Sequence, residues 1–268
     1  METTLKDRRA LITGASSGLG AEFARQLAAR GCHLVLVARR EQALTSLAET
    51  LKRDYRIEAE VISQDLSTAD AAEQLFQQVQ ARALTVDILI NNAGFGLHGE
   101  FMSQDHGALR KMLQLNMVTL TELTRLFAEP MVERGHGYLV QVGSVASFQP
   151  GPLYGAYSAS KAYVLSLGDA LNFELRNTGV SCTVVCPGVT ATEFLDSAGQ
   201  ASRTSFYQRL FMMQPAAVVS AGINAMLRRR SHVVTGWLNK IQVLALRLVS
   251  RSFAARAAWW GMSLDEKA

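Results

Sequence analysis

Runs of apolar residues alternate along the chain with longer segments whose apolar positions recur every three or four residues. The runs are continuous rather than alternately apolar and polar, which predicts strands buried on both faces, and the longer segments predict helices. The expected strands are residues 9–13, 33–37, 59–63, 86–90, 137–142, 180–186 and 232–234. The expected helices are residues 21–30, 41–54, 68–82, 104–131 and 155–177. Strands separated by helices predict an α/β fold with a doubly wound parallel sheet of about seven strands.

The domain organisation follows from where this alternation ends. The chain has 268 residues, of which 49% are hydrophobic and 19% charged, so it holds enough apolar material for one large core. No internal repeat, low-complexity tract or linker interrupts the pattern. We expect one domain over residues 1–236 and, at residues 237–268, a C-terminal helical extension of the same domain.

Charge is distributed unevenly along the chain. The net charge is +4, yet residues 197–264 hold nine Arg or Lys and no Asp or Glu, so the remainder carries a net charge of −5. The three cysteines are expected to be buried thiols in a reducing compartment. The sequence shows no signal peptide and no apolar stretch long enough to cross a membrane, which predicts a cytoplasmic protein. The five scattered histidines predict no metal site, and no nucleic-acid partner is expected.

A glycine-rich turn separates the first expected strand from the first helix, with the sequence Gly14-Ala15-Ser16-Ser17-Gly18-Leu19-Gly20. Glycines allow a tight turn and a close approach to a pyrophosphate, and the helix N-terminus supplies free amides with partial positive charge. The spacing is Gly-x3-Gly-x-Gly rather than the commoner Gly-x-Gly-x-x-Gly. The turn therefore predicts a dinucleotide site on a Rossmann-type sheet, with a plain strand-to-helix connection as the alternative.

Two arginines, Arg39 and Arg40, follow the second expected strand. An acid near this point accepts hydrogen bonds from a ribose 2′-hydroxyl, whereas an arginine accommodates a 2′-phosphate. The alternative is a solvated helix start, but two positive charges at a helix N-terminus oppose the helix dipole. The pair predicts NADP(H) as the cofactor, with NAD(H) the second choice.

Tyr157 and Lys161 are four residues apart, which places a phenol and an ammonium on one face of an expected helix. A neighbouring cation favours the phenolate and makes the phenol a usable acid or base. Alone, the pair is typical of an ordinary helix surface. Ser144 changes the interpretation because it follows an expected strand, at the edge where parallel α/β sheets bind ligands.

Together these residues resemble the classical short-chain dehydrogenase/reductase family. The resemblance covers roughly residues 8–235, and each motif alone is weak or moderate, but their coincidence in family order is specific. The matching motifs are Thr13–Gly20, Asp65-Leu66, Asn91-Asn92-Ala93-Gly94, Asn116, Ser144, Tyr157-x3-Lys161 and Pro187-Gly188-x3-Thr192. Within the family, residues 91–96 and 187–194 look like the bacterial DltE-like branch.

The resemblance implies a catalytic role for four positions. Tyr157 would be the general acid or base, and Ser144 would hydrogen-bond the reacting oxygen. Lys161 would hold the nicotinamide ribose and lower the pKa of Tyr157. Asn116 would hold a water molecule in a proton relay with Lys161, although an asparagine inside a helix can equally be a satisfied core amide.

The resemblance also implies the cofactor contacts. Asp65 would meet the adenine amine, Asn92 and Gly94 the adenosine ribose, and Thr190 and Thr192 the carboxamide and pyrophosphate; helix caps are the alternatives for Asp65 and Thr192. The full expected set is Gly14, Ser16, Ser17, Gly18, Leu19, Gly20, Arg39, Arg40, Asp65, Leu66, Asn92, Ala93, Gly94, Tyr157, Lys161, Pro187, Gly188, Thr190 and Thr192. One position departs from the family, because some NADPH-dependent members carry a basic residue where this chain has Ser17.

The substrate residues are expected on loops at the strand ends and on a lid-like insert at residues 193–213. The loop residues are Phe95, Leu97, His98, Phe148, Pro150, Leu153 and Tyr154. Their apolar character predicts a medium-sized carbonyl or alcohol, unless they mainly close the lid against the core. A working oxidoreductase is the leading interpretation, a dinucleotide sensor without turnover the second, and a surface-binding module the third. Family members pair helices across two-fold axes, which implies a homodimer or homotetramer.

The C-terminal extension has its own pattern. Residues 237–260 predict one basic amphipathic helix with an apolar stripe formed by Ile241, Leu244, Ala245, Leu248 and Val249. Four positive charges accompany it, on Lys240, Arg247, Arg251 and Arg256. Two interpretations stay open: the stripe packs on the protein's own body or a sister subunit, or it gives weak contact with the inner membrane surface. The sequence alone favours the first.

Overall fold

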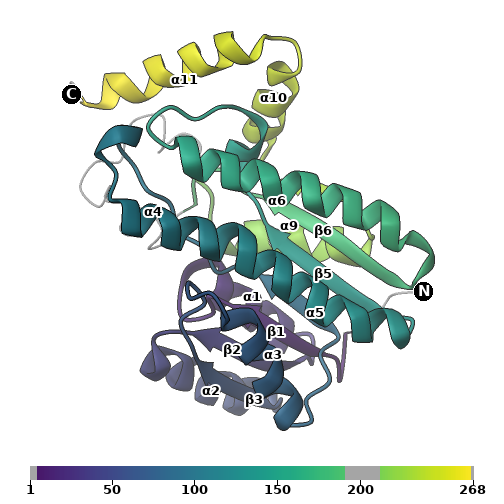
Figure 1. Ribbon diagram of the computed structural model, residues 1–268. Helices are drawn as coiled ribbons and strands as arrows, with labels where there is room; N and C mark the ends of the chain where they lie inside the picture. Colours follow the sequence, from purple (N-terminus) through teal and green to yellow (C-terminus); the bar gives the residue numbers. More distant parts are fainter. Residues whose placement is uncertain (1–4, 191–211, 267–268) are drawn as a thin grey trace.

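One seven-stranded sheet forms the centre of the computed structural model, which describes residues 5–190 and 212–266, with side chains up to residue 260 (Figure 1). Its strand order is β3-β2-β1-β4-β5-β6-β7, and all neighbouring pairs are parallel. The strands are β1 (Arg9–Thr13), β2 (His33–Ala38), β3 (Ala59–Ser63), β4 (Ile88–Asn91), β5 (Gly137–Val142), β6 (Val180–Cys186) and β7 (His232–Val234). The predicted α/β fold with a doubly wound, Rossmann-type parallel sheet is confirmed.

Helices cover both faces of this sheet. One face packs against α1 (Gly18–Ala28), α2 (Glu41–Tyr55) and α9 (Pro215–Leu227). The other packs against α3 (Ala71–Ala81), α5 (Leu120–Glu133) and the second half of α6 (Gly155–Glu174). The strands are mostly apolar because the inner ones face a hydrophobic cluster on each side of the sheet.

The strand order reverses between β1 and β4, since the chain first builds outward to β3 and then returns to the other side of β1. Ligands of open parallel sheets bind outside the carboxyl ends of the strands at such a point. Four predicted motifs leave the sheet at this edge: the glycine turn after β1, Asn92 after β4, Ser144 after β5 and Pro187 after β6. The topology therefore collects the predicted site residues on one side of the sheet.

The long helix expected at residues 104–131 is not continuous, so that prediction was wrong in detail. A short 3-10 turn (Phe101–Ser103) precedes α4 (His106–Leu113), and a π-helical turn (Gln114–Thr119) separates α4 from α5. Asn116 lies within the π turn and is completely buried. A π turn is an irregularity often found at functional sites, and here it places the predicted catalytic amide.

The C-terminal extension also differs from its prediction. Instead of one helix over residues 237–260, it contains α10 (Trp237–Leu246) and α11 (Arg251–Glu266), separated by a four-residue break. Figure 1 shows α11 above α4, away from the sheet. Within the described part of the chain, no helix is both long and apolar enough to span a bilayer. The lid-like insert expected at residues 193–213 lies almost entirely outside the described residues.

Candidate active site

The glycine turn has the geometry that a close approach to phosphate requires. Gly14 has a φ of +66° and Gly18 a φ of +55°, which side-chain-bearing residues rarely adopt. A Cβ on Gly14 would lie 2.9 Å from the Asn92 amide nitrogen, and a Cβ on Gly20 would overlap the Gly14 carbonyl oxygen. Ser17 stands at the N-cap of α1 without a side-chain cap bond. The residues present therefore fit a dinucleotide pyrophosphate at the N-terminus of α1.

Thr13 joins this turn to the loop after β4. Its hydroxyl accepts hydrogen bonds from the backbone amides of Asn92 and Ala93, each at 3.0 Å, and donates to Ile90. The side-chain amide of Asn92 donates in return to the carbonyl oxygens of Thr13 at 2.9 Å and Gly14 at 3.3 Å. Asn92 thus stabilises the glycine turn through these hydrogen bonds. The same residue is the one predicted to lie beside the adenosine ribose.

Arg40 reaches back from the end of β2 to the glycine turn. Its Nε and Nη2 atoms both donate to the Ser16 hydroxyl oxygen at 3.2 Å. Arg39 is also exposed, and its charge acts on Asp65. Arg40 is therefore oriented toward the glycine turn by Ser16, whereas Arg39 lies near Asp65, after β3.

Asp65 follows β3, and its side chain accepts hydrogen bonds within the turn that it begins. Its Oδ1 accepts hydrogen bonds from the Ser67 amide at 2.9 Å and the Ser67 hydroxyl at 2.8 Å. Burial acts to raise the pKa of Asp65, but the bonds from Ser67 and the charges of Arg39 and Lys111 lower it overall. The carboxylate is thus ionised and does not cap a helix, which removes the alternative considered for it.

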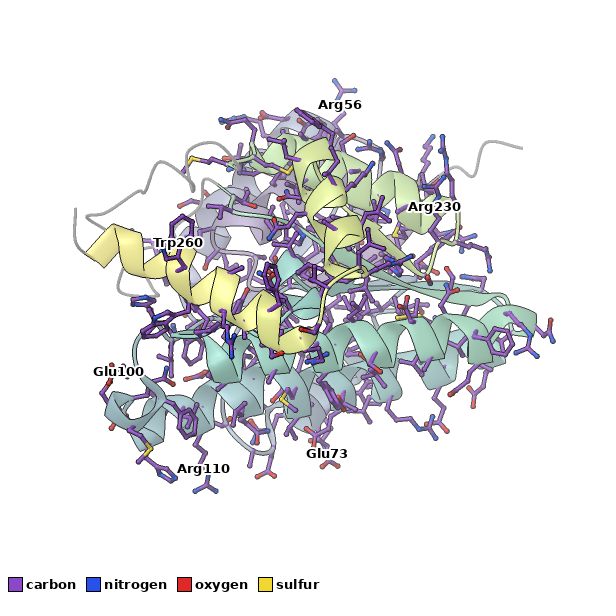
Figure 2. The ribbon with its side chains drawn as sticks, turned by 90° about the horizontal axis from the view of Figure 1, so that it is seen from above. Arg56, Glu73, Glu100, Arg110, Arg230 and Trp260 are labelled. Atoms are coloured by element: carbon purple, nitrogen blue, oxygen red, sulfur yellow. The ribbon has the colours of Figure 1, made fainter. Side chains whose placement is uncertain are left out.

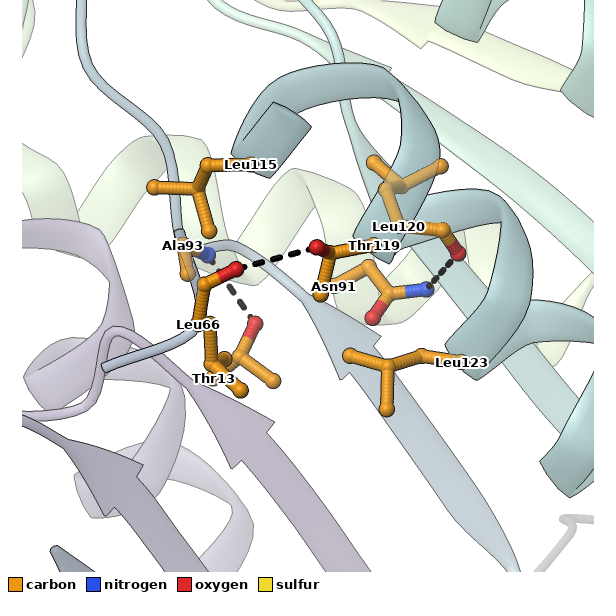
Figure 3. Close-up of a pocket in the computed structure, with 8 residues that line it drawn as sticks. All are labelled: Thr13, Leu66, Asn91, Ala93, Leu115, Thr119, Leu120 and Leu123. Atoms are coloured by element: carbon orange, nitrogen blue, oxygen red, sulfur yellow. Dashed lines mark hydrogen bonds between the residues drawn. The ribbon is translucent and has the colours of Figure 1, made fainter. Parts of the chain in front are cut away.

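A small pocket lies beneath this loop cluster (Figure 3). The predicted cofactor residues Leu66 and Ala93 form part of its wall, and the Leu66 carbonyl accepts a 2.9 Å bond from the Thr119 hydroxyl. The complete lining is Thr13, Leu66, Asn91, Ala93, Leu115, Thr119, Leu120 and Leu123. The pocket connects the loops after β1, β3 and β4 to the π turn and α5.

The Asn116 side chain is held on three sides. Its amide nitrogen donates to the Phe95 carbonyl at 2.9 Å and the Ser160 hydroxyl at 3.2 Å, and its oxygen accepts from the Phe95 amide at 3.2 Å. A Cβ on Gly94 would lie 2.9 Å from that oxygen and 3.5 Å from Lys161 Nζ. Asn116, Gly94 and Lys161 thus lie together, and the Asn116 side chain binds the loop after β4 and Ser160, while the predicted water relay stays a prediction.

Ser144, Tyr157 and Lys161 also meet. Ser144 is the N-cap of a 3-10 turn (Val145–Phe148), and its hydroxyl is hydrogen-bonded to Tyr157. Lys161 is 5% exposed, donates to the Val142 carbonyl at 2.8 Å, and has its ammonium 5.8 Å from the centre of the Tyr157 ring. The phenol, the hydroxyl and the ammonium converge at the carboxyl ends of β5 and β6.

Burial dominates the ionisation of this group. It raises the pKa of Tyr157 to about 12, while the hydrogen bond with Ser144 acts in the opposite direction. It lowers the pKa of Lys161 to about 8, with Cys186 acting in the opposite direction. Lys161 is not among the causes that act on the Tyr157 pKa, so the expected lowering by Lys161 stays a prediction, and the net pKa lies above its ordinary value because of burial. Tyr157 is a neutral phenol at pH 7.

The loop after β6 closes the site on the side of α10. Pro187 accepts a 2.9 Å backbone bond from Val145, and Thr190 donates to the Gly188 carbonyl at 3.0 Å. Gly188 has no room for a side chain because a Cβ there would overlap the amide of Asn239. Thr192, predicted to contact the cofactor, lies outside the described residues.

Two aromatic side chains lie in a row beside Tyr157. The Tyr154 ring centre lies 6.1 Å from that of Tyr157 and 5.0 Å from that of His98. Leu153 is buried. These three of the seven loop positions expected to face the substrate lie together. Phe148 instead packs edge-on against His232, with ring centres 6.2 Å apart.

Sequence reasoning missed two serines that orient the catalytic group. Ser147 accepts from the Ser144 amide at 3.3 Å and donates to the Lys161 carbonyl at 2.8 Å, joining the two elements. Ser160 donates to the Tyr157 carbonyl at 2.7 Å while accepting from Asn116. No spacing signal distinguishes them from other serines. Among the described residues, no group of His, Cys, Asp or Glu has the arrangement of a metal site.

Comparison with known proteins agrees with this geometry. The sequence profile of a family described as "short chain dehydrogenase" matches residues 8–203. The ketoacyl reductase HetN of Nostoc sp. is 31% identical over 268 residues, covering 97% of this chain and 91% of the relative.

Solved structures give the same result at the level of the fold. A short-chain dehydrogenase from Sphingobium yanoikuyae, in complex with NADPH, has a TM-score of 0.80 at 32% identity, covering 96% of both chains. The bulky-bulky ketone specific alcohol dehydrogenase from Comamonas testosteroni has a TM-score of 0.76 at 29% identity, covering 90% of this chain and 92% of that one.

Proposed function

This chain belongs to the short-chain dehydrogenase family, whose members are oxidoreductases of CH–OH and C=O groups, and we propose that it interconverts a carbonyl and an alcohol with NADP(H). The observation that supports this most is the convergence of Ser144, Tyr157 and Lys161 at the carboxyl edge of the sheet. A dinucleotide sensor would have no need of a buried ammonium beside a phenol bonded to a serine hydroxyl.

In the proposed mechanism the dinucleotide, when bound, supplies or accepts the hydride. Ser144 and Tyr157 hydrogen-bond the reacting oxygen, and Tyr157, protonated at pH 7, donates the proton that a carbonyl oxygen needs on reduction. In the reverse direction the phenolate accepts that proton. Lys161 would hold the ribose hydroxyls of the bound dinucleotide, and its ammonium would return a proton to Tyr157. Asn116 keeps the loop after β4 in place beside Lys161.

The cofactor preference is supported by the residues after β2. Arg39 and Arg40 offer two guanidinium groups where an NAD-specific site would place an acid, and Arg40 is oriented by Ser16. NAD(H) is the second choice. Asp65, Leu66, Asn92 and the residues after β6 complete the proposed cofactor contacts.

The proposed substrate is a medium-sized apolar carbonyl or alcohol. The aromatic rings of Tyr154 and His98 beside Tyr157 support it, as does the likeness to the bulky-bulky ketone specific alcohol dehydrogenase. We further propose that the chain forms a homodimer or homotetramer. We also propose that it belongs to the DltE-like branch, on the basis of residues 91–96 and 187–194.

The three buried cysteines form no disulfide, which favours a reducing, cytoplasmic location.

The test is a turnover assay with NADPH against a panel of bulky apolar ketones and aldehydes, beside NADH at matched concentrations. We expect consumption of NADPH with at least one ketone and much slower use of NADH. Tight NADPH binding without turnover on any member of the panel, with Tyr157→Phe indistinguishable from wild type, would instead support the dinucleotide sensor.

A further inference from the structure

Both C-terminal helices present apolar side chains to solvent. Along α10 and the turn after it, the side chains at positions 237, 241, 244 and 248 fall on one helical face. Trp237 is 69%, Leu244 61% and Leu248 85% exposed. On α11 the exposed aromatic residues are Phe253, Trp259 and Trp260. The stripe predicted from the sequence exists, but among the described residues it does not pack on the protein's own body, so that half of the favoured interpretation was wrong, while packing on a sister subunit stays untested.

This outward orientation is fixed by what the two helices bury. The inner face of α10 holds Asn239 and Val243, which are 3% and 7% exposed. Asn239 donates to the Thr235 carbonyl at 2.8 Å and packs against Gly188, so it connects α10 to the proposed cofactor loop. The inner residue of α11 is Ala254, at 6% exposed. The apolar face of α10 therefore lies opposite its buried face, whereas α11 buries only Ala254 among its described side chains.

Positive charge accompanies the exposed apolar face. Lys240, Arg247, Arg251 and Arg256 are all exposed, and none of them forms an ion pair within the part of the chain that the structure describes. No acidic residue occurs anywhere in residues 197–264 to balance them. An amphipathic helix pair with tryptophan, phenylalanine and leucine beside arginine and lysine has the composition of a membrane-surface element.

We propose that α10 and α11 form a surface that binds anionic lipid membranes from one side, without crossing them. The basic residues meet the lipid phosphates, and the exposed apolar side chains enter the headgroup region. A second copy of this chain is a poorer occupant, because a two-fold contact through this surface would bring the same four positive charges face to face. Exposed apolar area of this kind on a folded protein marks an interaction site.

The surface lies on the same edge of the sheet as the candidate active site. Helix α10 begins three residues after the carboxyl end of β7, and it packs against the 3-10 turn that starts after Ser144. Figure 2 shows Trp260 and Glu100 towards one end of the molecule, and Glu100 precedes the exposed Phe101 and Met102. Apolar carbonyl compounds dissolved in lipid would thus meet the protein on its active-site side. The lipid contact itself is independent of the proposed turnover.

The test is flotation of the whole protein with vesicles of phosphatidylglycerol and phosphatidylcholine, against vesicles of phosphatidylcholine alone. The variant pair is Arg247→Glu with Arg251→Glu. The matched control is Arg228→Glu with Arg230→Glu, which makes the same charge change on exposed arginines that precede β7, and Figure 2 shows Arg230 at the opposite end from Trp260. A third variant, Leu244→Ser with Leu248→Ser, removes apolar area only.

We expect wild type and the control pair to float with anionic vesicles at low salt, and to lose binding at about 0.5 M salt, where charges are screened. The Arg247/Arg251 pair should weaken partitioning at least about 30-fold, and the leucine pair should weaken it as well. No flotation of wild type at low salt, or equal loss in the control pair, would overturn the proposal. So would a fall in particle mass of the leucine pair without a change in flotation, since it would assign the surface to a second copy.

Discussion

The two ends of the candidate site are built by different means. The nucleotide end consists of main-chain geometry, with Gly14 at positive φ, and of the exposed Arg39 and Arg40. The catalytic end consists of buried polar side chains, with Asn116 at 0% and Lys161 at 5% exposure. Exposed groups can be changed at little cost in stability, whereas a buried polar network couples chemistry to folding. Substitutions at the two ends should therefore differ in their effects on stability and on activity.

The largest effect is expected at the phenol. Tyr157→Phe removes the proton donor and should lower turnover by about 10²–10⁴-fold, while the dissociation constant for NADPH stays nearly unchanged. Steady-state kinetics and fluorescence titration with NADPH measure the two quantities. The control is Tyr163→Phe on the same helix, whose hydroxyl pairs with Thr121 at 2.9 Å. A variant that keeps more than a tenth of the wild-type rate would mean that another residue donates the proton.

Lys161 should separate activity from stability. Lys161→Met is expected to weaken NADPH binding and turnover, yet to raise the free energy of unfolding by about 2 kcal/mol at pH 7. The reason is that burial lowers the pKa of Lys161 from 10.5 to about 8, so the folded state carries a charge that it disfavours. The loss of its bond to Val142 offsets part of that gain.

The sign of the pH dependence follows from the same shift. Between about pH 8 and 10.5 the unfolded lysine keeps its proton and the folded one loses it, so the stability of the wild type rises with pH. The difference in free energy of unfolding between Lys161→Met and the wild type should therefore shrink as the pH rises from about 8 to 10.5. Urea unfolding of the wild type and of Lys161→Met at about pH 7, 9 and 10 measures this difference in free energy. A constant difference would show that Lys161 does not titrate there.

At the nucleotide end the effect should fall on one cofactor only. Arg40→Ala should weaken the binding of NADPH by roughly 10–150-fold, the range for loss of one charged hydrogen bond. The binding of NADH should stay nearly unchanged. Arg39→Ala should act in the same direction. Lys52→Ala, an exposed cation at the far end of α2, serves as the control. Equal binding of NADH and NADPH by the wild type would remove the basis for this assignment.

The same contrast explains what the sequence predicts well. The strand runs, the glycine turn and the pair of Tyr157 and Lys161 are local patterns, so residue spacing is enough to find them. The π turn around Asn116 could not be predicted, because the bonds that hold it come from Phe95 and Ser160, which are distant along the chain. The break between α10 and α11 was also missed, since the apolar spacing continues through it.

Side-chain roles at the catalytic end were harder to predict than positions. Thr13 and Ser147 orient the site through hydrogen bonds to the backbone of remote elements, and Ser160 does so through the side chain of Asn116. Serine and threonine are common, and nothing in their spacing indicates such partners. Burial was invisible as well, so the sequence suggested a lowered pKa for Tyr157 where the structure raises it.

The smallest effect is expected at Ser160, which acts on catalysis through other residues. Its hydroxyl donates to the Tyr157 carbonyl and accepts from the Asn116 amide, so Ser160→Ala removes one restraint from each. We expect kcat to fall by roughly 2–13-fold, the equivalent of about 0.5–1.5 kcal/mol for one hydrogen bond, with KM nearly unchanged. The control is Ser158→Ala, since Ser158 is equally buried on α6 and its hydroxyl bonds to no described residue. Ser158→Ala should leave kcat unchanged. If both variants reduce kcat alike, the effect comes from packing of α6 and Ser160 has no positioning role.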